Sequence, residues 1–182
     1  MSKEYNLSID DIIIIDNYLE NPNFIRNIAL NKKYRNHQIG ENWRGFRNIP
    51  PLEEKIFFDV QKNIFGNLNK NYVEFNCFFH YYTSKDNKFI NSNSIHKDIV
   101  GDEYIMYAAI IYLTPNVLKE NSGTSFFDEQ KNFIFSVENV FNRMILYPSN
   151  IFHSPSGFFG KSIENSRLTF NSFSRFKSSE SD

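Results

Sequence analysis

The apolar residues in the first third of the chain recur at the spacing of amphipathic helices. Within residues 22–32, one helical stripe is formed by Phe24, Ile25, Ile28 and Ala29. Asn21 and Pro22 precede this stripe, and the pair is typical of an N-cap followed by proline at the first helical position. A second stripe fills residues 51–65, and Gly66 marks its end. We therefore predict two helices, at residues 22–32 and 51–65.

From residue 72 onward the pattern changes to short runs rich in β-branched and aromatic residues, which is typical of strands. We predict strands at residues 73–82, 104–113, 123–127, 142–147 and 167–173. The isoleucine-rich residues 9–16 predict a further, buried strand at the start of the chain. Residues 136–141 fit either a turn or one limb of a hairpin, and residues 42–47 and 85–94 are expected to be loops.

Helices followed by seven or eight strands predict a mainly β protein with flanking helices, in the α+β class. The helices would pack on one outer face of an antiparallel double-sheet roll. A chain of 182 residues fits a single domain. We expect helical support over about residues 1–70, a β-core over about 72–176 and a polar tail at 177–182. With 20 Phe residues, much of the core is expected to be aromatic.

Charge and cysteine content narrow the class of protein. The formal net charge of −1 gives no overall field that would favour nucleic acid or an anionic membrane, so neither partner is expected. The single cysteine, Cys77, cannot form an internal disulfide and is predicted to be a buried, inert thiol. The N-terminus lacks a signal-peptide pattern, and the longest apolar run, residues 12–15, is too short to cross a bilayer. We therefore expect a cytoplasmic protein.

Three side chains of metal-ligand type occur in the second half of the chain, namely His96, Asp98 and His153. Side chains at i and i+2 of an extended segment point the same way, so His96 and Asp98 could face one ion while Lys97 faces away. Two imidazoles and one carboxylate form the facial triad that suits non-haem Fe(II), because they leave one side of the octahedron open. A surface or core role is the alternative for each histidine, but the strand-like runs around the three residues favour a metal site.

The order of these residues resembles that of the iron(II)/2-oxoglutarate-dependent dioxygenases, and within that superfamily the prolyl-hydroxylase-like branch. The resemblance covers about residues 72–176 and is closer to small bacterial and phage members than to animal collagen enzymes. Its parts are His96 and Asp98, Tyr112-Leu113, Gly123-Thr124 followed by Phe126 or Phe127, His153, and Arg167 with Thr169. It implies a double-stranded β-helix, or jelly-roll, core.

The resemblance also implies a chemistry. His96, Asp98 and His153 would be the catalytic residues that hold Fe(II) and leave coordination positions for 2-oxoglutarate and O2. Arg167 would bind the distal carboxylate of 2-oxoglutarate with its two-pronged guanidinium, and Thr169 would add a hydroxyl. The implied reaction hydroxylates an aliphatic carbon and releases succinate and CO2 from the cosubstrate.

A tyrosine is expected to touch the cosubstrate as well. Either Tyr81 or Tyr82 must face inward, because strand side chains alternate, and Tyr107 and Tyr112 compete on the strand that follows Asp98. We take Tyr82 and Tyr107 as the predicted contacts. His37 and His80 are not expected to bind the metal, since the triad is complete without them.

The sequence is also compatible with two other functions. A binding or sensor protein could keep the β-core without turnover, and a cupin-type metalloprotein could bind Zn or Mn without 2-oxoglutarate. The complete triad together with Arg167 favours the oxygenase. Its substrate could be a protein residue such as proline, a free amino acid or another small metabolite. Trp43, Arg44 and Arg47 could line a substrate entrance or form an exposed loop of stacked side chains.

Overall fold

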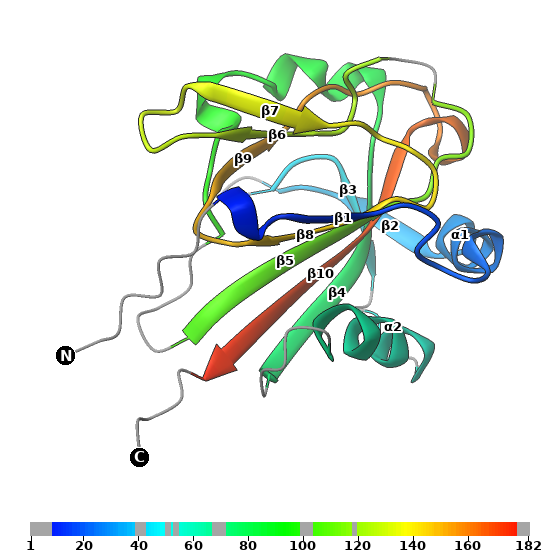
Figure 1. Cartoon of the computed structure of the whole chain (residues 1–182). Helices are drawn as coiled ribbons and strands as arrows, with labels where there is room; N and C mark the ends of the chain where they lie inside the picture. The colour runs from blue at the N-terminus through cyan, green and yellow to red at the C-terminus, as the bar shows by residue number, and fades with distance from the viewer. Residues whose placement is uncertain are drawn as a thin grey trace.

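The computed structural model describes residues 9–38, 43–49, 52, 55–66, 72–98, 104–117 and 120–177. Two antiparallel sheets and two α-helices make up most of this part, in layers that Figure 1 shows. The larger sheet has the order β1 (Ile13–Ile15), β8 (Met144–Pro148), β5 (Tyr104–Tyr112), β10 (Arg167–Lys177), β4 (Tyr72–Tyr82), β3 (Phe46–Ile49) and β2 (Lys33–Asn36). The smaller sheet has the order β7 (Phe133–Val137), β6 (Thr124–Phe127) and β9 (Phe152–Pro155). The protein is thus mainly β with few helices, as predicted.

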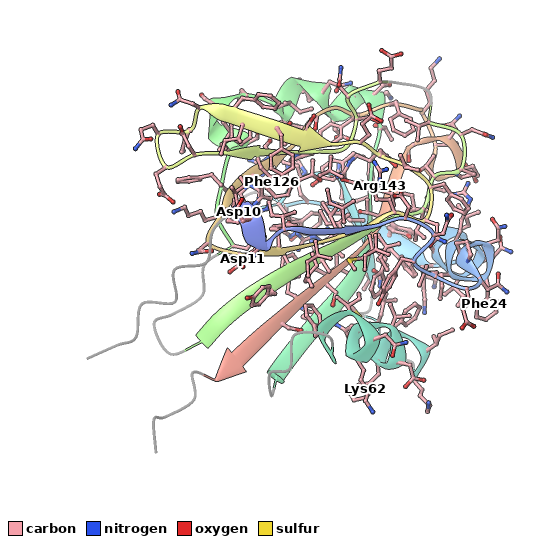
Figure 2. The ribbon with its side chains drawn as sticks, in the orientation of Figure 1. Asp10, Asp11, Phe24, Lys62, Phe126 and Arg143 are labelled. Atoms are coloured by element: carbon pink, nitrogen blue, oxygen red, sulfur yellow. The ribbon has the colours of Figure 1, made fainter. Side chains whose placement is uncertain are left out.

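Helix α1 (Pro22–Leu30) begins as the sequence predicted. The Asn21 side-chain oxygen accepts a hydrogen bond of 3.1 Å from the Phe24 N–H, and Pro22 occupies the first turn. This cap satisfies a backbone donor that has no partner within the helix. Within the predicted stripe, Ile25 and Ala29 are buried, whereas Phe24 is 49% exposed and points away from the body of the molecule in Figure 2. The helix ends at Leu30, two residues before the predicted end.

Helix α2 (Lys55–Gly66) ends at the predicted glycine. Of the residues predicted to begin it, 51, 53 and 54 lie outside the described part of the chain, and Leu52 is buried but not helical. Both helices pack on one face of the larger sheet, which they cover from below and from the side in Figure 1. The buried side chains of this layer are mostly aliphatic and aromatic, and include Ile25, Ala29, Phe57, Ile64, Phe65, Cys77, Phe79, Leu168 and Phe170. The predicted buried state of Cys77 is confirmed.

A second apolar cluster fills the space between the two sheets. It joins the opposite face of β5 and β8 to the inner side of the smaller sheet, and its buried members are Ala108, Ile110, Tyr112, Phe126, Val137, Ile145, Tyr147 and Ile151. Figure 2 labels Phe126 in this space, and its ring centre lies 5.3 Å from that of Tyr147. Because successive strand residues point to opposite faces, each central strand supplies alternate side chains to the two clusters.

The opening strand is not buried, and this prediction from the isoleucine run is wrong. Strand β1 pairs only with β8, and its three isoleucines are 36–45% exposed. It therefore lies at the edge of the sheet, where one side of the strand faces solvent. A short 3-10 turn, Ile9–Asp11, precedes it within the predicted segment.

Two predicted loops contain ordered structure. Of the predicted loop 42–47, the described residues 43–47 run into β3, and residues 85–94 contribute to the 3-10 turns Ser84–Phe89 and Ser92–Ser94. Strand β2 was not predicted at all, because its residues are mostly polar and its pairing with β3 depends on backbone hydrogen bonds. The undecided segment 136–141 contains the end of β7, so its first two residues belong to a hairpin limb. No helix in the described ranges is long and apolar enough to cross a membrane.

Candidate metal centre

Backbone hydrogen bonds hold the His96–Asp98 segment against the smaller sheet. The His96 N–H donates to the His153 carbonyl at 3.1 Å, and the His153 N–H donates to the His96 carbonyl at 3.0 Å. The Asp98 N–H donates to the Ser149 carbonyl at 2.8 Å. Residues paired in this antiparallel way present their side chains on the same side. The two imidazole rings therefore lie side by side, with their centres 4.5 Å apart.

The three predicted metal-ligand side chains converge at this bridge. The Asp98 carboxylate lies between the two imidazoles, with Oδ1 3.5 Å from His96 Nε2 and Oδ2 3.2 Å from His153 Nε2. The ligand atoms all lie within 4.8 Å of one another. One atom from each of the three residues is therefore close enough to the others for the group to hold a single metal ion. The side chain of His153 is 6% exposed and that of His96 is 47% exposed, so the group is open on the His96 side.

Backbone carbonyls orient both imidazoles. His96 Nδ1 lies 2.8 Å from the Ser94 carbonyl, and His153 Nδ1 lies 3.0 Å from the Ile151 carbonyl. A carbonyl only accepts, so each Nδ1 carries the proton. In the neutral ring, Nε2 then keeps its lone pair and faces Asp98. This arrangement, in which the second ring nitrogen is held by a carbonyl, is typical of histidines that bind metals.

The charges of the three side chains are coupled. Burial would lower the pKa of His153, but the charge of Asp98 and its hydrogen bond outweigh burial and raise this pKa. Burial would raise the pKa of the Asp98 carboxyl, but His153, His96 and Arg47 outweigh it and lower this pKa. The pKa of His96 is lowered by burial and by the neighbouring His153. The carboxylate is therefore ionised at neutral pH and makes the centre attractive to a cation.

Arg167, at the start of β10, is buried on the side of the sheet that faces the smaller sheet. It is 3% exposed, and its Nε donates to the Ser122 carbonyl at 3.1 Å. One terminal nitrogen donates to the Gly123 carbonyl at 3.3 Å and to Thr124 Oγ1 at 3.4 Å. No acidic side chain in the described part of the chain forms an ion pair with it. The guanidinium is thus fixed by neutral acceptors and could bind an anion.

Thr169 shares this face of β10 with Arg167, as predicted from their i, i+2 spacing. It is fully buried, and its hydroxyl donates to the His80 carbonyl at 3.2 Å. The hydroxyl oxygen keeps acceptor capacity, but its proton is used by the backbone of β4. The structure therefore places Thr169 on the same face of β10 as Arg167 and also gives it a structural hydrogen bond.

Tyr107 does not lie at this site, and its choice over Tyr112 is corrected. Tyr107 packs in the cluster beneath the helices, whereas Tyr112 is fully buried between the sheets. The Tyr112 hydroxyl lies 2.8 Å from Thr124 Oγ1, and its ring centre lies 5.4 Å from the Arg167 guanidinium. Burial raises the pKa of Tyr112 although Arg167 opposes this, so its hydroxyl is protonated and can donate.

Tyr82 lies near the same guanidinium, as expected of a residue on the inward face of β4. Its ring centre is 5.8 Å from the Arg167 guanidinium carbon, and its ring stacks on Phe158 with the centres 4.1 Å apart. Burial raises the pKa of the Tyr82 hydroxyl to about 12, and Asp98 contributes in the same direction. Tyr82 therefore lies beside the arginine, and its hydroxyl is close enough to the Asp98 carboxylate to be influenced by its charge.

Tyr147 is a further residue at the centre that the sequence reasoning missed. Its ring centre lies 4.8 Å from that of His153, and it is 1% exposed on β8. Burial and the charge of Asp98 raise its pKa well above the usual value. The sequence places Tyr147 in a strand that leads to His153, two residues after Ile145, and this position could have indicated a residue near the centre. The strand is buried on both faces, however, so its sequence does not show which of its residues point toward the centre.

Comparison with solved structures places this arrangement in a known fold. A prolyl-4-hydroxylase from Pseudomonas putida superposes with a TM-score of 0.61 at 16% identity, over 92% of this chain and 93% of that one. A prolyl hydroxylase from Trichoplax adhaerens, in complex with a hypoxia inducible factor peptide fragment, gives 0.57 at 13% identity, over 91% and 83%. HygX from Streptomyces hygroscopicus, with nickel, 2-oxoglutarate and hygromycin B bound, gives 0.58 at 10% identity, over 92% and 83%.

The chain has the fold of the 2-oxoglutarate- and iron(II)-dependent oxygenases. A structure from Burkholderia pseudomallei that carries this family description superposes with a TM-score of 0.59 at 10% identity. No family model matches the sequence, and no curated protein matches it either. The identities to the solved structures are 10–16%, so the likeness lies in the fold.

Proposed function

We propose that this protein is an Fe(II)- and 2-oxoglutarate-dependent oxygenase that hydroxylates an aliphatic carbon of its substrate. One observation carries the proposal. The side chains of His96, Asp98 and His153 converge, and a buried Arg167 without an acidic partner among the described residues lies on the same side of the larger sheet. On this proposal the two sheets form a double-stranded β-helix that belongs to one domain.

The donor set fits an iron ion. Two imidazole Nε2 atoms and a carboxylate make a mixed nitrogen and oxygen set with one open side, which suits non-haem Fe(II). The Nδ1 atoms of both histidines are held by backbone carbonyls, so neither ring must reorient to offer Nε2. His96, Asp98 and His153 would hold the ion, and Asp98 would neutralise part of its charge.

The surroundings of Arg167 fit the distal carboxylate of 2-oxoglutarate. A buried carboxylate is costly unless it is paired, and a guanidinium offers it two parallel donors. Tyr112 and Tyr82 add hydroxyl groups near the same guanidinium, and both stay protonated at neutral pH. Arg167 would bind the carboxylate, Tyr112 and Tyr82 would orient it, and Thr169 would fix the backbone beneath it.

When bound, iron and 2-oxoglutarate supply the oxidising chemistry, with O2 consumed and succinate and CO2 released. The protein would contribute by positioning the bound groups and by excluding water from them. Tyr147 and His153 are almost fully buried and shield the inner side of the centre, whereas the more exposed His96 leaves its outer side accessible to substrate. The prolyl hydroxylases and HygX among the similar structures are consistent with either a protein residue or a small metabolite as substrate.

Two alternatives make different use of the same residues. A binding or sensor protein with this fold would not need all three ligand side chains, and a cupin-type Zn or Mn protein would not need Arg167. The buried cation between Ser122, Gly123 and Thr124 therefore favours an enzyme that binds a dicarboxylate.

The test is the weak visible charge-transfer band that an Fe(II)–2-oxoglutarate chelate gives under anaerobic conditions. We expect the band in the wild-type protein and in Asp59→Ala, a surface control on α2, and its loss in Asp98→Ala and His96→Ala. Release of succinate from 2-oxoglutarate across a panel of prolyl peptides and free amino acids then tests turnover. A wild-type protein without the band at saturating cosubstrate would contradict the proposal.

A further inference from the structure

Cationic and aromatic side chains alternate in a cluster next to the candidate metal centre. We name it the arginine–tryptophan cluster, and its members are Arg35, Trp43, Arg44, Arg47, Lys88 and Phe89. The Trp43 ring centre lies 4.9 Å from the Arg35 guanidinium and 4.4 Å from that of Arg47. The Phe89 ring centre lies 5.6 Å from the Arg44 guanidinium and 4.9 Å from the Lys88 ammonium. His37 links the two rings, at 6.4 Å from Trp43 and 5.8 Å from Phe89.

Arg47 connects this cluster to the centre. It pairs with His80 in the register of β3 and β4, and His80 pairs in turn with Thr169 on β10. Trp43 contacts the same histidine, with ring centres 5.7 Å apart. Arg47 also acts electrostatically on Asp98 and on Tyr82. The half-buried Arg47 therefore lies on the same face of the larger sheet as His80 and Thr169, while Arg44 and Lys88 are exposed.

The segments that build this margin carry an excess of positive charge. The described residues 33–38, 43–49 and 84–89 contain Lys33, Arg35, Arg44, Arg47, Lys85 and Lys88. Their one acidic residue is Asp86, which is buried and accepts hydrogen bonds from the backbone and hydroxyl of Thr83. Cations gathered within one cluster raise the local concentration of anions, although the whole chain is nearly neutral.

The aromatic rings do not form a platform on which nucleic-acid bases could stack. Trp43 is only 9% exposed, and its ring is surrounded by Arg35, Arg47, His37 and His80. Binding of single strands needs open aromatic faces beside a basic groove. Here the rings hold the guanidinium groups in place instead. Fixed guanidinium groups suit a compact anion, because little rotamer entropy is lost when it binds.

We propose that the substrate of this enzyme carries a compact oxyanion, a carboxylate or a phosphate group, that binds the arginine–tryptophan cluster while the carbon to be oxidised lies at the candidate metal centre. This inference rests on the proposed oxygenase function and adds the substrate class. Arg47 is then the specificity-determining residue, and Arg44 and Lys88 guide the anion inward.

Trp43 is the single tryptophan of the chain, so its fluorescence reports on this cluster directly. The metal-free, full-length protein is titrated with inorganic phosphate, with acetyl-glutamate amide and with the neutral acetyl-glutamine amide. We expect a saturable change with the phosphate or the glutamate compound and none with the glutamine compound. A response to phosphate alone identifies a phosphorylated substrate, and a response to glutamate alone identifies a carboxylate. No saturable response to either anion would overturn the proposal.

Variants distinguish anion binding at the cluster from a general effect of ionic strength on the protein. We expect Arg47→Gln to weaken anion binding by about tenfold or more, because a charge-assisted hydrogen bond is lost. Arg44→Gln, at an exposed position, should weaken anion binding less. This variant replaces Arg47→Gln in the test if Arg47→Gln does not fold. Arg143→Gln is the matched control, since Arg143 pairs with Asp16 on β1, and it should bind the anion as the wild type does. Equal affinity in Arg44→Gln, Arg47→Gln and Arg143→Gln would contradict the assignment.

The fluorescence titration tests the anion site independently of the oxygenase function, because it needs neither iron, 2-oxoglutarate nor turnover. A charge-transfer band together with no anion response refutes the substrate class and leaves the oxygenase intact. An anion response without the band supports the anion site and refutes the oxygenase. If a single-stranded oligonucleotide binds far more tightly than both compact anions, the substrate class is wrong and a nucleic acid takes its place.

Discussion

Arg167 and Tyr112 meet at one hydroxyl group. A terminal nitrogen of Arg167 donates to Thr124 Oγ1 at 3.4 Å, and the Tyr112 hydroxyl lies 2.8 Å from the same oxygen. The three residues come from β10, β5 and β6, so both sheets contribute to the arrangement. An anion that enters beside Arg167 would therefore find a guanidinium and a phenol already held in place.

Arg167→Ala should weaken the binding of 2-oxoglutarate far more than the binding of metal. The side chain contacts no atom of the triad in the described structure, and loss of a bidentate charged contact costs about 10- to 100-fold in affinity. Isothermal titration with 2-oxoglutarate, in the presence of Ni(II) and without oxygen, measures the first effect. Titration with Ni(II) alone measures the second. Equal loss of both affinities would show that Arg167 acts through folding, as its bonds to Ser122 and Gly123 also permit.

Tyr112→Phe should lower the affinity for 2-oxoglutarate about three- to tenfold, because one neutral hydrogen bond is removed. Tyr107→Phe is the matched control on the same strand. Its ring lies in the cluster beneath the helices, on the opposite face of β5 from Tyr112. The same calorimetric titration applied to both variants decides between them. A larger effect of Tyr107→Phe would restore the sequence-based choice.

His80 should make the protein less stable in acid. Its pKa is lowered well below 6.5, first by burial and then by Arg47, so the folded state keeps it neutral. Below about pH 6.5 the unfolded chain binds a proton at this histidine and the folded protein does not. The free energy of unfolding then falls with falling pH by at most about 1.4 kcal/mol per pH unit from this residue.

Urea unfolding at several pH values between 5 and 8 measures this slope for the wild type and for His80→Gln. The glutamine amide can still donate to the Arg44 carbonyl, which His80 Nε2 contacts. His153, whose pKa is raised, acts in the opposite direction, but it is unchanged in the variant. The difference between the two slopes therefore isolates His80. Parallel slopes would show that His80 binds a proton as readily in the folded protein as in the unfolded chain.

Gly123→Ala should destabilise the protein by about 1–3 kcal/mol, as overpacked interiors do. A Cβ at this position would lie 1.7 Å from the Val137 carbonyl oxygen and 2.9 Å from the Asn139 nitrogen, and neither backbone atom can move freely. The shift would also displace the Gly123 carbonyl that accepts from Arg167. Thermal unfolding measures the first effect and the affinity for 2-oxoglutarate the second. An unchanged melting temperature would mean that β6 and β7 can separate without cost.

The sequence determined the parts of the site that depend on local geometry. The i, i+2 spacing placed His96 and Asp98 on one side of an extended segment, and likewise Arg167 and Thr169 on one face of a strand. The cap of α1 was also local, because an asparagine followed by proline satisfies the first helical donor without help from the rest of the chain. Each of these features needs only a few consecutive residues.

Tertiary structure decided which of two equivalent faces became the inside. Strand β5 is buried on both faces, so its sequence shows no alternation that could distinguish Tyr107 from Tyr112. Only the packing of the helices on one face and of the second sheet on the other shows that Tyr107 faces the helices and Tyr112 the space between the sheets. The isoleucines of β1 are exposed because that strand has a neighbour on one side alone. Arg47 lies on the same face as His80 and Thr169 only because β3 pairs with β4, a contact between residues that lie far apart along the chain.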